Sequence, residues 1–203
     1  MGNSSNVGEN DSIEIYAKAT AQLIEHLKLQ PVALCGHHTG GVVAIELCAT
    51  HPELVDTLIL SSTPWIDKAA REKRAKKIPI DTIKAKKDGT HLTNLWRQRA
   101  PYYPDKIEYM ERFLSDALKC SDPSHGHHAV GQYEMEKTIS KILCPTLIIE
   151  HGNDPFSVKH TMALKKNLPK ANIAYIPNGH VALEVTAPQF CKTLKEWVQK
   201  NSL

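Results

Sequence analysis

Two adjacent histidines, His37 and His38, are candidates for catalysis because of their residue type and their place in the stretch Gly-His-His-Thr-Gly at positions 36–40. The stretch follows an apolar run and precedes an apolar helical pattern, so we expect a tight turn between a strand and a helix. An imidazole can act as a nucleophile, and an acyl-imidazole is labile enough to turn over. The N-terminal end of the following helix also favours an anion at this turn. The sequence therefore predicts a reaction site at this turn.

The elements that must position this turn are indicated by the periodicity of the apolar residues. Apolar residues at helical spacing predict helices, and short apolar runs bounded by turn residues predict strands. The predicted helices cover residues 12–29, 40–50, 157–166 and 188–199, and the predicted strands cover 31–35, 57–61, 144–149 and 171–176. Strands that alternate with helices and show little polar alternation are typical of a parallel sheet buried on both faces. We therefore expect an α/β fold with a mostly parallel sheet.

Residues 64–138 break this alternation, because they are helical in pattern, charged, and rich in Lys, Arg and Tyr. We interpret them as a helical cap inserted into one domain, whose sheet-and-helix parts are residues 1–63 and 139–203. The basic run 68–87 could bind nucleic acid or an anionic surface, or could form the solvated face of a cap helix. The net charge of only +3 favours the solvated face, which could instead attract acidic substrates.

Length and composition fit a globular chain with one core, since the 203 residues are 41% hydrophobic. No run approaches the roughly 18 consecutive apolar residues that a membrane span needs, and the polar residues 1–12 lack the apolar segment of a signal peptide. Of five cysteines, Cys35, Cys48 and Cys144 lie in apolar runs and predict buried, reduced thiols. We expect a reducing, cytoplasmic location and no membrane partner.

Three segments of the sequence resemble landmarks of the α/β-hydrolase fold family. Residues 36–41 resemble its nucleophile elbow. Residues 147–154, an apolar run that leads into Gly-Asn-Asp, resemble the loop that carries the family's acid, and residues 176–184, with Gly-His after the last strand, resemble the loop that carries its catalytic histidine. The three segments occur in the family's order. The resemblance covers nearly the whole chain outside the predicted cap and implies an α/β-hydrolase fold.

The resemblance also implies a role for each site residue. His180 would be the base, and Asp154 would orient its imidazole and stabilise the imidazolium. The backbone N–H of Thr39 would donate to the developing oxyanion, and the elbow glycines Gly36 and Gly40 would let the strained turn pack against neighbouring backbone. Because imidazoles near one carboxylate shift each other's pKa values, we expect the activity to depend on pH.

The sequence departs from the family pattern at the nucleophile, where it has His38 instead of Ser, Cys or Asp. Three interpretations follow. His38 is itself the nucleophile, or His38 binds or polarises the substrate while His180 and Asp154 activate water, or ester chemistry has ended and the fold binds a ligand. The residue types alone leave these three interpretations open.

A second departure concerns the start of the chain. Residues 1–4 already resemble the loop ahead of the family's first helix, so the first strands of the family's sheet and one oxyanion donor are expected to be missing. The strand at 31–35 would then be an exposed sheet edge, which is a template for pairing. We expect a homodimer through this edge, a poorly stable chain, or a fragment of a longer product.

The implied activity is hydrolysis of a small or medium organic ester, thioester, lactone or activated C–C bond, with a non-catalytic ligand-binding or scaffold protein as the alternative. His37, Trp65, Trp96 and Tyr133 are candidates for substrate contacts in an apolar pocket. A metal is a rival hypothesis because of the histidines at 125–128, yet no His-Glu-x-x-His or Cys-x-x-Cys spacing occurs. We expect no metal or cofactor, a small-molecule substrate, and no nucleic-acid partner.

Overall fold

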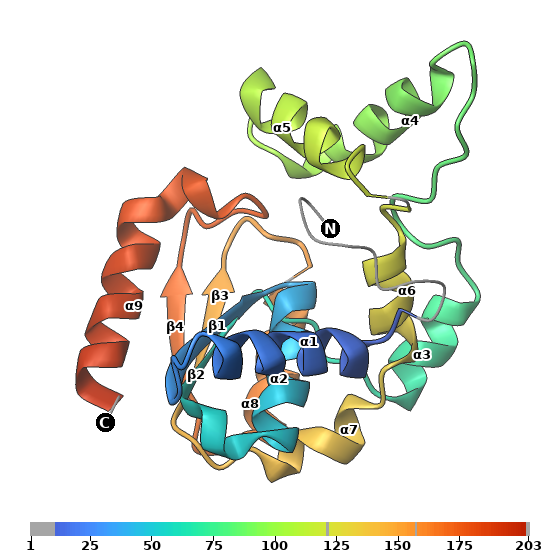
Figure 1. Ribbon diagram of the computed structural model, residues 1–203. Helices are drawn as coiled ribbons and strands as arrows, with labels where there is room; N and C mark the ends of the chain where they lie inside the picture. Colours follow the sequence, from blue (N-terminus) through green and yellow to red (C-terminus); the bar gives the residue numbers. More distant parts are fainter. Residues whose placement is uncertain (1–10, 121, 157, 202–203) are drawn as a thin grey trace.

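The computed structural model describes residues 11–120, 122–156 and 158–201. Within them, four parallel strands form one sheet in the order β1-β2-β3-β4, flanked by helices on both faces (Figure 1). The strands are β1 (Val32–His37), β2 (Val55–Ser61), β3 (Thr146–His151) and β4 (Asn172–Ile176). The helices beside the sheet include α1 (Ile13–His26), α2 (Thr39–Thr50), α8 (Val158–Asn167) and α9 (Ala187–Asn201). The predicted α/β fold with a parallel sheet is confirmed; residues 1–4 and 157, on which two expectations fall, lie outside the described residues.

The sheet is buried on both faces because successive residues of a strand point to opposite sides. In β2, Leu58 and Leu60 join the larger apolar cluster with α1, α2 and α8, whereas Ile59 joins a second cluster with α9. These three side chains are almost completely buried. This is why the strand sequences are continuously apolar rather than alternating.

Helix α1 shows how the local sequence sets an element. The Oγ of its N-cap residue, Ser12, accepts a hydrogen bond from the backbone N–H of Ile15 at 3.3 Å, which satisfies one of the unpaired N–H groups at the helix start. Its buried residues recur every three or four positions, at Ile13, Ala17, Ala21 and Ile24, and this stripe faces the core. None of the helices that the structure describes combines the length and the apolar character needed to cross a membrane.

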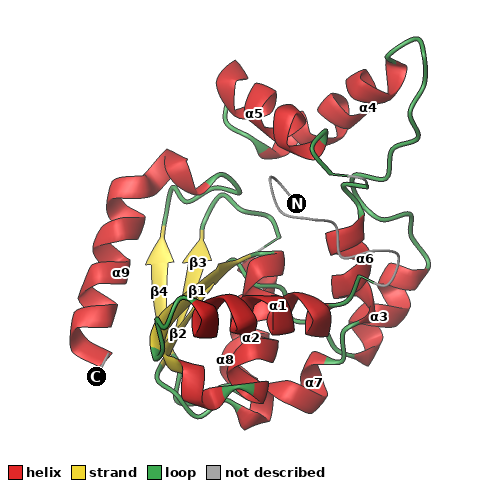
Figure 2. Ribbon diagram, viewed as in Figure 1, coloured by secondary structure: helices red, strands yellow, loops and turns green. Residues whose placement is uncertain are grey.

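The chain between β2 and β3 contributes helices in the residues described there (Figure 2). These are α3 (Lys68–Ala75), α4 (Thr90–Arg99), α5 (Ile107–Ala117), α6 (His125–Gln132) and α7 (Met135–Thr138). The 3-10 turns in the whole of the described chain are η1 (Pro52–Leu54), η2 (Ala100–Tyr102), η3 (Ile139–Lys141) and η4 (Leu183–Thr186). Helices α4 and α5 stand away from the sheet (Figure 1), whereas Val130 of α6 and Met135 of α7 belong to the core cluster. The boundaries of a separate cap at 64 and 138 stay a prediction.

Strand β1 is one edge of the described sheet, since it pairs only with β2. Ala33 and Cys35 share one face of β1, and both are exposed. The expectation that Cys35 is buried is therefore wrong, because β1 lies at an edge of the described sheet and its face with Cys35 is open to solvent. Cys48 is buried as expected, with its sulfur 3.2 Å from that of the half-buried Cys144. Dimerisation through β1 stays a prediction.

Candidate active site

The carboxyl ends of three neighbouring strands each carry a polar residue. His37, Ser61 and His151 are the last residues of β1, β2 and β3. His37 lies directly opposite Ser61 in the strand register, and His151 lies two residues beyond Ile149, which is opposite Ser61. Residues two apart in a strand share a face. The parallel register therefore gathers three polar side chains at the carboxyl ends of the strands, where ligands bind in open parallel α/β sheets.

These three side chains form one chain of hydrogen bonds. The Nε2 of His37 lies 3.0 Å from the carbonyl oxygen of Val181, and it must donate because a carbonyl only accepts. The Nδ1 of His37 then accepts from the Ser61 hydroxyl at 2.9 Å. The Ser61 oxygen accepts in turn from the Nε2–H of His151 at 2.9 Å. This pattern fixes which nitrogen of a neutral His37 carries the proton, and it requires a proton on Nε2 of His151. Sequence reasoning found neither Ser61 nor His151.

The electrostatic surroundings keep both rings neutral. Burial, reinforced by the neighbouring His38, lowers the pKa of His37 to about 3. Burial also lowers the pKa of His151, whose Nδ1 is buried without a hydrogen-bond partner in the described chain. The His37 and His38 rings meet edge to face with centroids 4.3 Å apart. His37 therefore supports the neighbouring ring without competing with it for a proton.

His38 occupies the turn between β1 and α2, with φ 49° and ψ −117°. A non-glycine residue in this region of the backbone map stores strain of about 1–3 kcal/mol. Backbone hydrogen bonds hold the turn on both sides, from the His38 N–H to the Ser61 carbonyl and from the Gly41 N–H to the His38 carbonyl, each at 3.0 Å. Thr39 begins α2, so its N–H is among those without a partner inside the helix.

The turn is so tight that one glycine in it is indispensable. A Cβ atom on Gly36 would lie 2.3 Å from the carbonyl oxygen of Gly40 and 2.6 Å from the Cα of Gly41, whereas a Cβ on Gly40 would meet nothing within 4 Å. Of the two predicted elbow glycines, only Gly36 therefore needs to lack a side chain, whereas Gly40 contributes its backbone carbonyl to the close approach. A second close approach involves Gly41, whose added Cβ would lie 1.9 Å from the Oγ1 of Thr63.

We predict that Gly36→Ala lowers the free energy of unfolding by about 3 kcal/mol, because the added methyl group must push apart packed backbone. Gly40→Ala is the matched control on the same turn, and it should leave stability unchanged or raise it by up to about 1 kcal/mol, since alanine favours the helix. Urea unfolding of the two variants measures the difference. Equal stability of the two variants would contradict this geometry.

The His38 side chain is hydrogen-bonded to the predicted acid, Asp154. Its Nε2 lies 2.7 Å from the Oδ2 of Asp154, a completely buried residue in the loop after β3. The Oδ1 of Asp154 accepts from the backbone N–H of Phe156 at 2.9 Å. Burial alone would raise the pKa of Asp154, but the hydrogen bond and charge of His38 outweigh it and hold that pKa below its usual range. The pair is therefore a short, charge-assisted hydrogen bond.

The His38 side chain, 26% exposed, lines a cavity of about 350 Å³. Thr39 and His37 line it as well, so three of the predicted site residues meet there. The other lining residues come from the loops after the strands, from α8, and from the segment between β2 and β3. They are Pro64, Arg74, Ile80, Arg99, Tyr103, His127, Val130, Phe156, Lys159, His160 and Val181. A volume of this size suits a small organic molecule.

Comparison with known proteins agrees with this architecture, although no family model matches the chain. A proline iminopeptidase of Lactobacillus acidophilus is 25% identical over 229 residues, which cover 95% of this chain and 75% of that protein. The solved structure of MGS-M2, an α/β-hydrolase enzyme from a Medee basin deep-sea metagenome library, has a TM-score of 0.79 at 17% identity and covers 100% of this chain and 78% of that one. The chain has an α/β-hydrolase fold. The enol-lactonase of Burkholderia xenovorans LB400 has a TM-score of 0.70 at 19% identity, over 93% and 74% of the two chains.

Within this α/β-hydrolase fold, Asp154 is paired with His38 and not with His180. Among the side-chain hydrogen bonds of the described residues, none joins His180 to Asp154, and the buried Nδ1 of His180 has no partner. The physical reason lies in side-chain length, because an imidazole at position 38 reaches the carboxylate that a serine would leave to a separate base. The expected pairing thus differs from the one that the structure shows.

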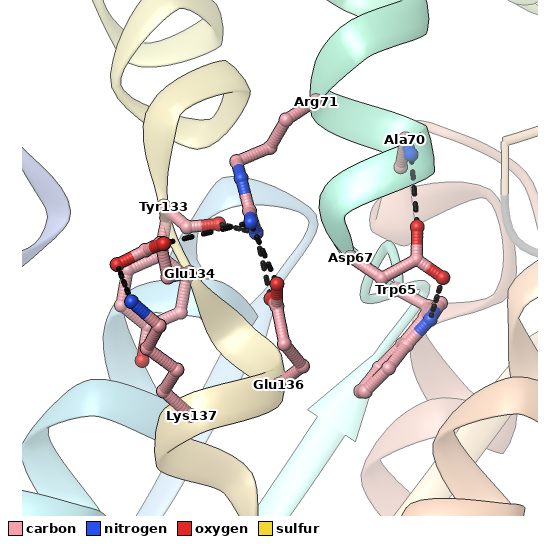
Figure 3. Close-up of polar contacts among 8 residues, drawn as sticks. All are labelled: Trp65, Asp67, Ala70, Arg71, Tyr133, Glu134, Glu136 and Lys137. Carbon is pink, nitrogen blue, oxygen red and sulfur yellow. Dashed lines mark hydrogen bonds and ion pairs between the residues drawn. The ribbon is translucent and has the colours of Figure 1, made fainter.

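The aromatic residues suggested for substrate contacts are not brought to the cavity of this α/β-hydrolase fold. The Nε1 of Trp65 donates to the Oδ2 of Asp67 at 3.0 Å (Figure 3). The buried Tyr133 donates its hydroxyl hydrogen to Glu46 at 2.8 Å. Trp96 lies on α4 outside the lining residues. Of the four suggested contact residues, only His37 lines the cavity.

Three groups at the site lie close enough to share a metal ion, namely one nitrogen each of His37 and His38 and an oxygen of Asp154, all within 4.8 Å of one another. Both nitrogens of His37 are already engaged, by the Ser61 hydroxyl and the Val181 carbonyl. A metal that uses His37 would have to displace one of these two bonds, so His37 is committed to hydrogen bonding in this structure.

The histidines at 125–128 have separate partners. The Nδ1 of His125 lies 2.9 Å from an oxygen of Asp11, and the Nε2 of His127 lies 3.2 Å from an oxygen of Asp81. His128 bonds to a glutamine within its own helix. In the described part of the chain these three side chains do not converge on one point.

Proposed function

We propose that the chain hydrolyses a small or medium organic ester, thioester or lactone, with His38 and Asp154 as the reacting pair. The observation that carries this proposal is the 2.7 Å bond between His38 Nε2 and Asp154 Oδ2, made at a strained turn that faces a cavity. An activated C–C bond is a related substrate class for the same site. The similarity to a protein named enol-lactonase supports the reaction class.

In this proposal His38 is the base, and its hydrogen-bond pattern supports that role. Its Nε2–H donates to the Asp154 carboxylate, so its Nδ1 carries the lone pair. In the reaction, Nδ1 takes a proton from water while the water oxygen attacks the carbonyl carbon. The buried carboxylate stabilises the imidazolium that forms. When the C–O bond breaks, the imidazolium returns the proton to the leaving oxygen, which gives an acid and an alcohol and regenerates the base.

The oxyanion of the tetrahedral intermediate needs a hydrogen-bond donor close to the base. The backbone N–H of Thr39 is one such donor, because Thr39 lines the cavity and begins α2. The positive N-terminal end of α2 adds a favourable field at the same place. In this proposal His180 lies outside the reacting pair, because His38 already holds the carboxylate that would orient it.

The alternative function is a ligand-binding protein without catalysis. The observation that favours it is the absence of a hydroxyl, thiol or carboxylate nucleophile at position 38, where the α/β-hydrolase resemblance expects one. In that case the cavity and the His38–Asp154 pair would bind a ligand and leave it unchanged.

The test is a panel of short p-nitrophenyl esters and a lactone, offered to the natural chain and to His38→Ser. We expect the natural chain to turn over at least one of them above the rate of free imidazole, and His38→Ser to be slower. Activity that arises only in His38→Ser would overturn the enzymatic proposal and establish the ligand-binding alternative. Circular dichroism of both proteins verifies that they are folded.

A further inference from the structure

Every charged side chain that lines the cavity is basic. Arg74, Arg99 and Lys159 face it, together with the imidazoles of His127 and His160. No aspartate or glutamate is among the lining residues in the part of the chain that the structure describes. This imbalance is local, because the whole chain carries a net charge of only +3.

One of these cations is neutralised by a partner within the protein. Arg99 pairs with Asp81 through two of its nitrogens, and its Nε lies 2.7 Å from the Oδ1 of Asp81. The Nε2 of His127 lies 3.2 Å from the other oxygen of Asp81. Asp81 is only 4% exposed. Arg99 therefore forms a buried ion pair and leaves little charge for a ligand.

Arg74 has no such partner among the residues that the structure describes, and a neighbouring arginine on α3 shows the contrast. Arg71 makes a two-pronged ion pair with Glu136, with both nitrogen–oxygen distances at 2.6 Å (Figure 3). Arg74 lies one helical turn further and makes no ion pair with any described residue, although its side chain is half-buried. Its stem runs along Gly131 of α6, where an added Cβ would lie 3.9 Å from the Cβ of Arg74.

A half-buried guanidinium that makes no ion pair with any described residue is unusual, because burying a charge without a counter-charge is costly. Burial lowers the pKa of Arg74, but an arginine stays protonated in proteins. The positive charge therefore persists at the cavity wall, and a bound anion would remove the cost of burying it. A planar guanidinium also binds carboxylate and phosphate oxygens through two parallel hydrogen bonds.

The second unpaired cation lies on α8. Lys159 lines the cavity and makes no ion pair in the described chain. Arg74 of α3 and Lys159 of α8 therefore line the same cavity, together with His160. In agreement with this placement, burial, followed by the charges of Lys159 and Arg74, lowers the pKa of His160 to about 4.

The acidic groups near this point are engaged elsewhere. Asp154 holds His38, and Asp67 accepts from the backbone N–H of Ala70 and from Trp65 (Figure 3). Their charges weaken the positive field at His160 without giving Arg74 a partner.

We propose that the cavity takes substrates that carry an anionic oxygen group, a carboxylate or a phosphate, which Arg74 binds with help from Lys159 while the bond to be cleaved lies at His38. The nature of that bond rests on the proposed function, whereas the anion site itself does not. Within the basic run 68–87, only Arg74 and Ile80 line the cavity. The attraction to acidic substrates therefore depends on one arginine of the run and not on its total charge.

The first experiment compares p-nitrophenyl butyrate with the mono-p-nitrophenyl ester of glutarate, which has the same leaving group and adds a carboxylate. We expect the natural chain to have the lower KM for the glutarate ester. Arg74→Gln should raise that KM by roughly 10- to 100-fold, the range for losing a charge-assisted hydrogen bond, and should raise the KM for the butyrate ester far less. Lys159→Gln should raise it by a smaller factor, about threefold to tenfold, because a lysine contributes only a point charge.

Two further variants separate the site from general effects. Lys73→Gln removes the same charge from the neighbouring, exposed position of α3, which does not line the cavity, and should change neither KM. Arg74→Lys keeps the charge and most of the stem, so it should restore part of the preference if Arg74→Gln is folded poorly. An equal loss for both esters in Arg74→Gln would overturn the proposal.

The second experiment measures binding without turnover, by titration calorimetry of the natural chain and Arg74→Gln with glutarate and with inorganic phosphate. Binding that is lost in Arg74→Gln supports the anion site even if no ester is hydrolysed, and in that case only the proposed function fails. Tighter binding of phosphate than of glutarate assigns the site to phosphate-bearing substrates, and the reverse assigns it to carboxylates. If neither anion binds while both esters are hydrolysed equally well, the anion site is wrong and the proposed function stands.

Discussion

Replacing His38 by glutamine should lower kcat for the best ester by roughly 100- to 10,000-fold, which is the usual contribution of a positioned general base. Glutamine has a polar side chain of similar length, so it can still reach Asp154, but it cannot take up a proton. Asp154→Asn should cause a loss of the same order, because an amide at this place favours the wrong tautomer of His38 and no longer stabilises the imidazolium. Initial rates at saturating ester measure both effects.

The matched control for this prediction is His180→Gln. Because the structure joins the Asp154 carboxylate to His38 and not to His180, this variant should keep kcat within about threefold of the natural chain, far less than a lost base would cost. The opposite result would be a loss of kcat of roughly 100-fold or more in His180→Gln together with only a small loss in His38→Gln. In that case His180 is the base, and the arrangement implied by the family resemblance forms in solution. The thermal unfolding of each variant must be compared, since a misfolded protein would also lose activity.

The elements of the fold were predictable because their signals are local. The strand predicted at 171–176 is β4 at Asn172–Ile176, and the helix predicted at 40–50 is α2 at Thr39–Thr50. In each case an apolar period and a flanking turn residue define the element before any tertiary contact is known. The exposure of Cys35 could not be predicted from the apolar pattern, since its run is as apolar as that of a central strand. Only the resemblance to the α/β-hydrolase family indicated that this strand would be a sheet edge.

The places of the candidate residues His38 and Asp154 in the fold were also predictable, but their hydrogen-bond partners were not. His38 and Asp154 follow from a turn and a loop that are recognisable in sequence. Which imidazole holds the carboxylate depends on reach in three dimensions. Ser61 and His151 carry a weaker signal, as polar residues that end buried strands. Only the strand register shows that they lie next to His37. Arg74 has no sequence signal at all, because nothing in a basic run distinguishes it from the paired Arg71.

Lowering the pH should destabilise the chain through His37. The unfolded chain protonates a histidine near pH 6.5, whereas the folded His37 has its pKa lowered to about 3 by burial and by His38. Between these values the unfolded state binds more protons, so the free energy of unfolding falls as the pH falls, by about 1.4 kcal/mol per pH unit for this one group. His160, with its pKa lowered to about 4, adds a second contribution of the same sign. Urea unfolding at pH 6.0, 5.5, 5.0 and 4.5 measures the total slope.

The share that belongs to His37 is isolated by His37→Gln, because the difference in stability between this variant and the natural chain should itself change by about 1.4 kcal/mol per pH unit. His26→Gln, on the exposed side of α1, is the matched control and should leave the slope as it is. The cause is structural, since Nε2 of His37 already donates to Val181 and Nδ1 already accepts from Ser61. A proton on Nδ1 would face the hydroxyl hydrogen and break the chain that leads to His151. Parallel stability curves for the natural chain and His37→Gln would show that the ring takes up a proton without this conflict.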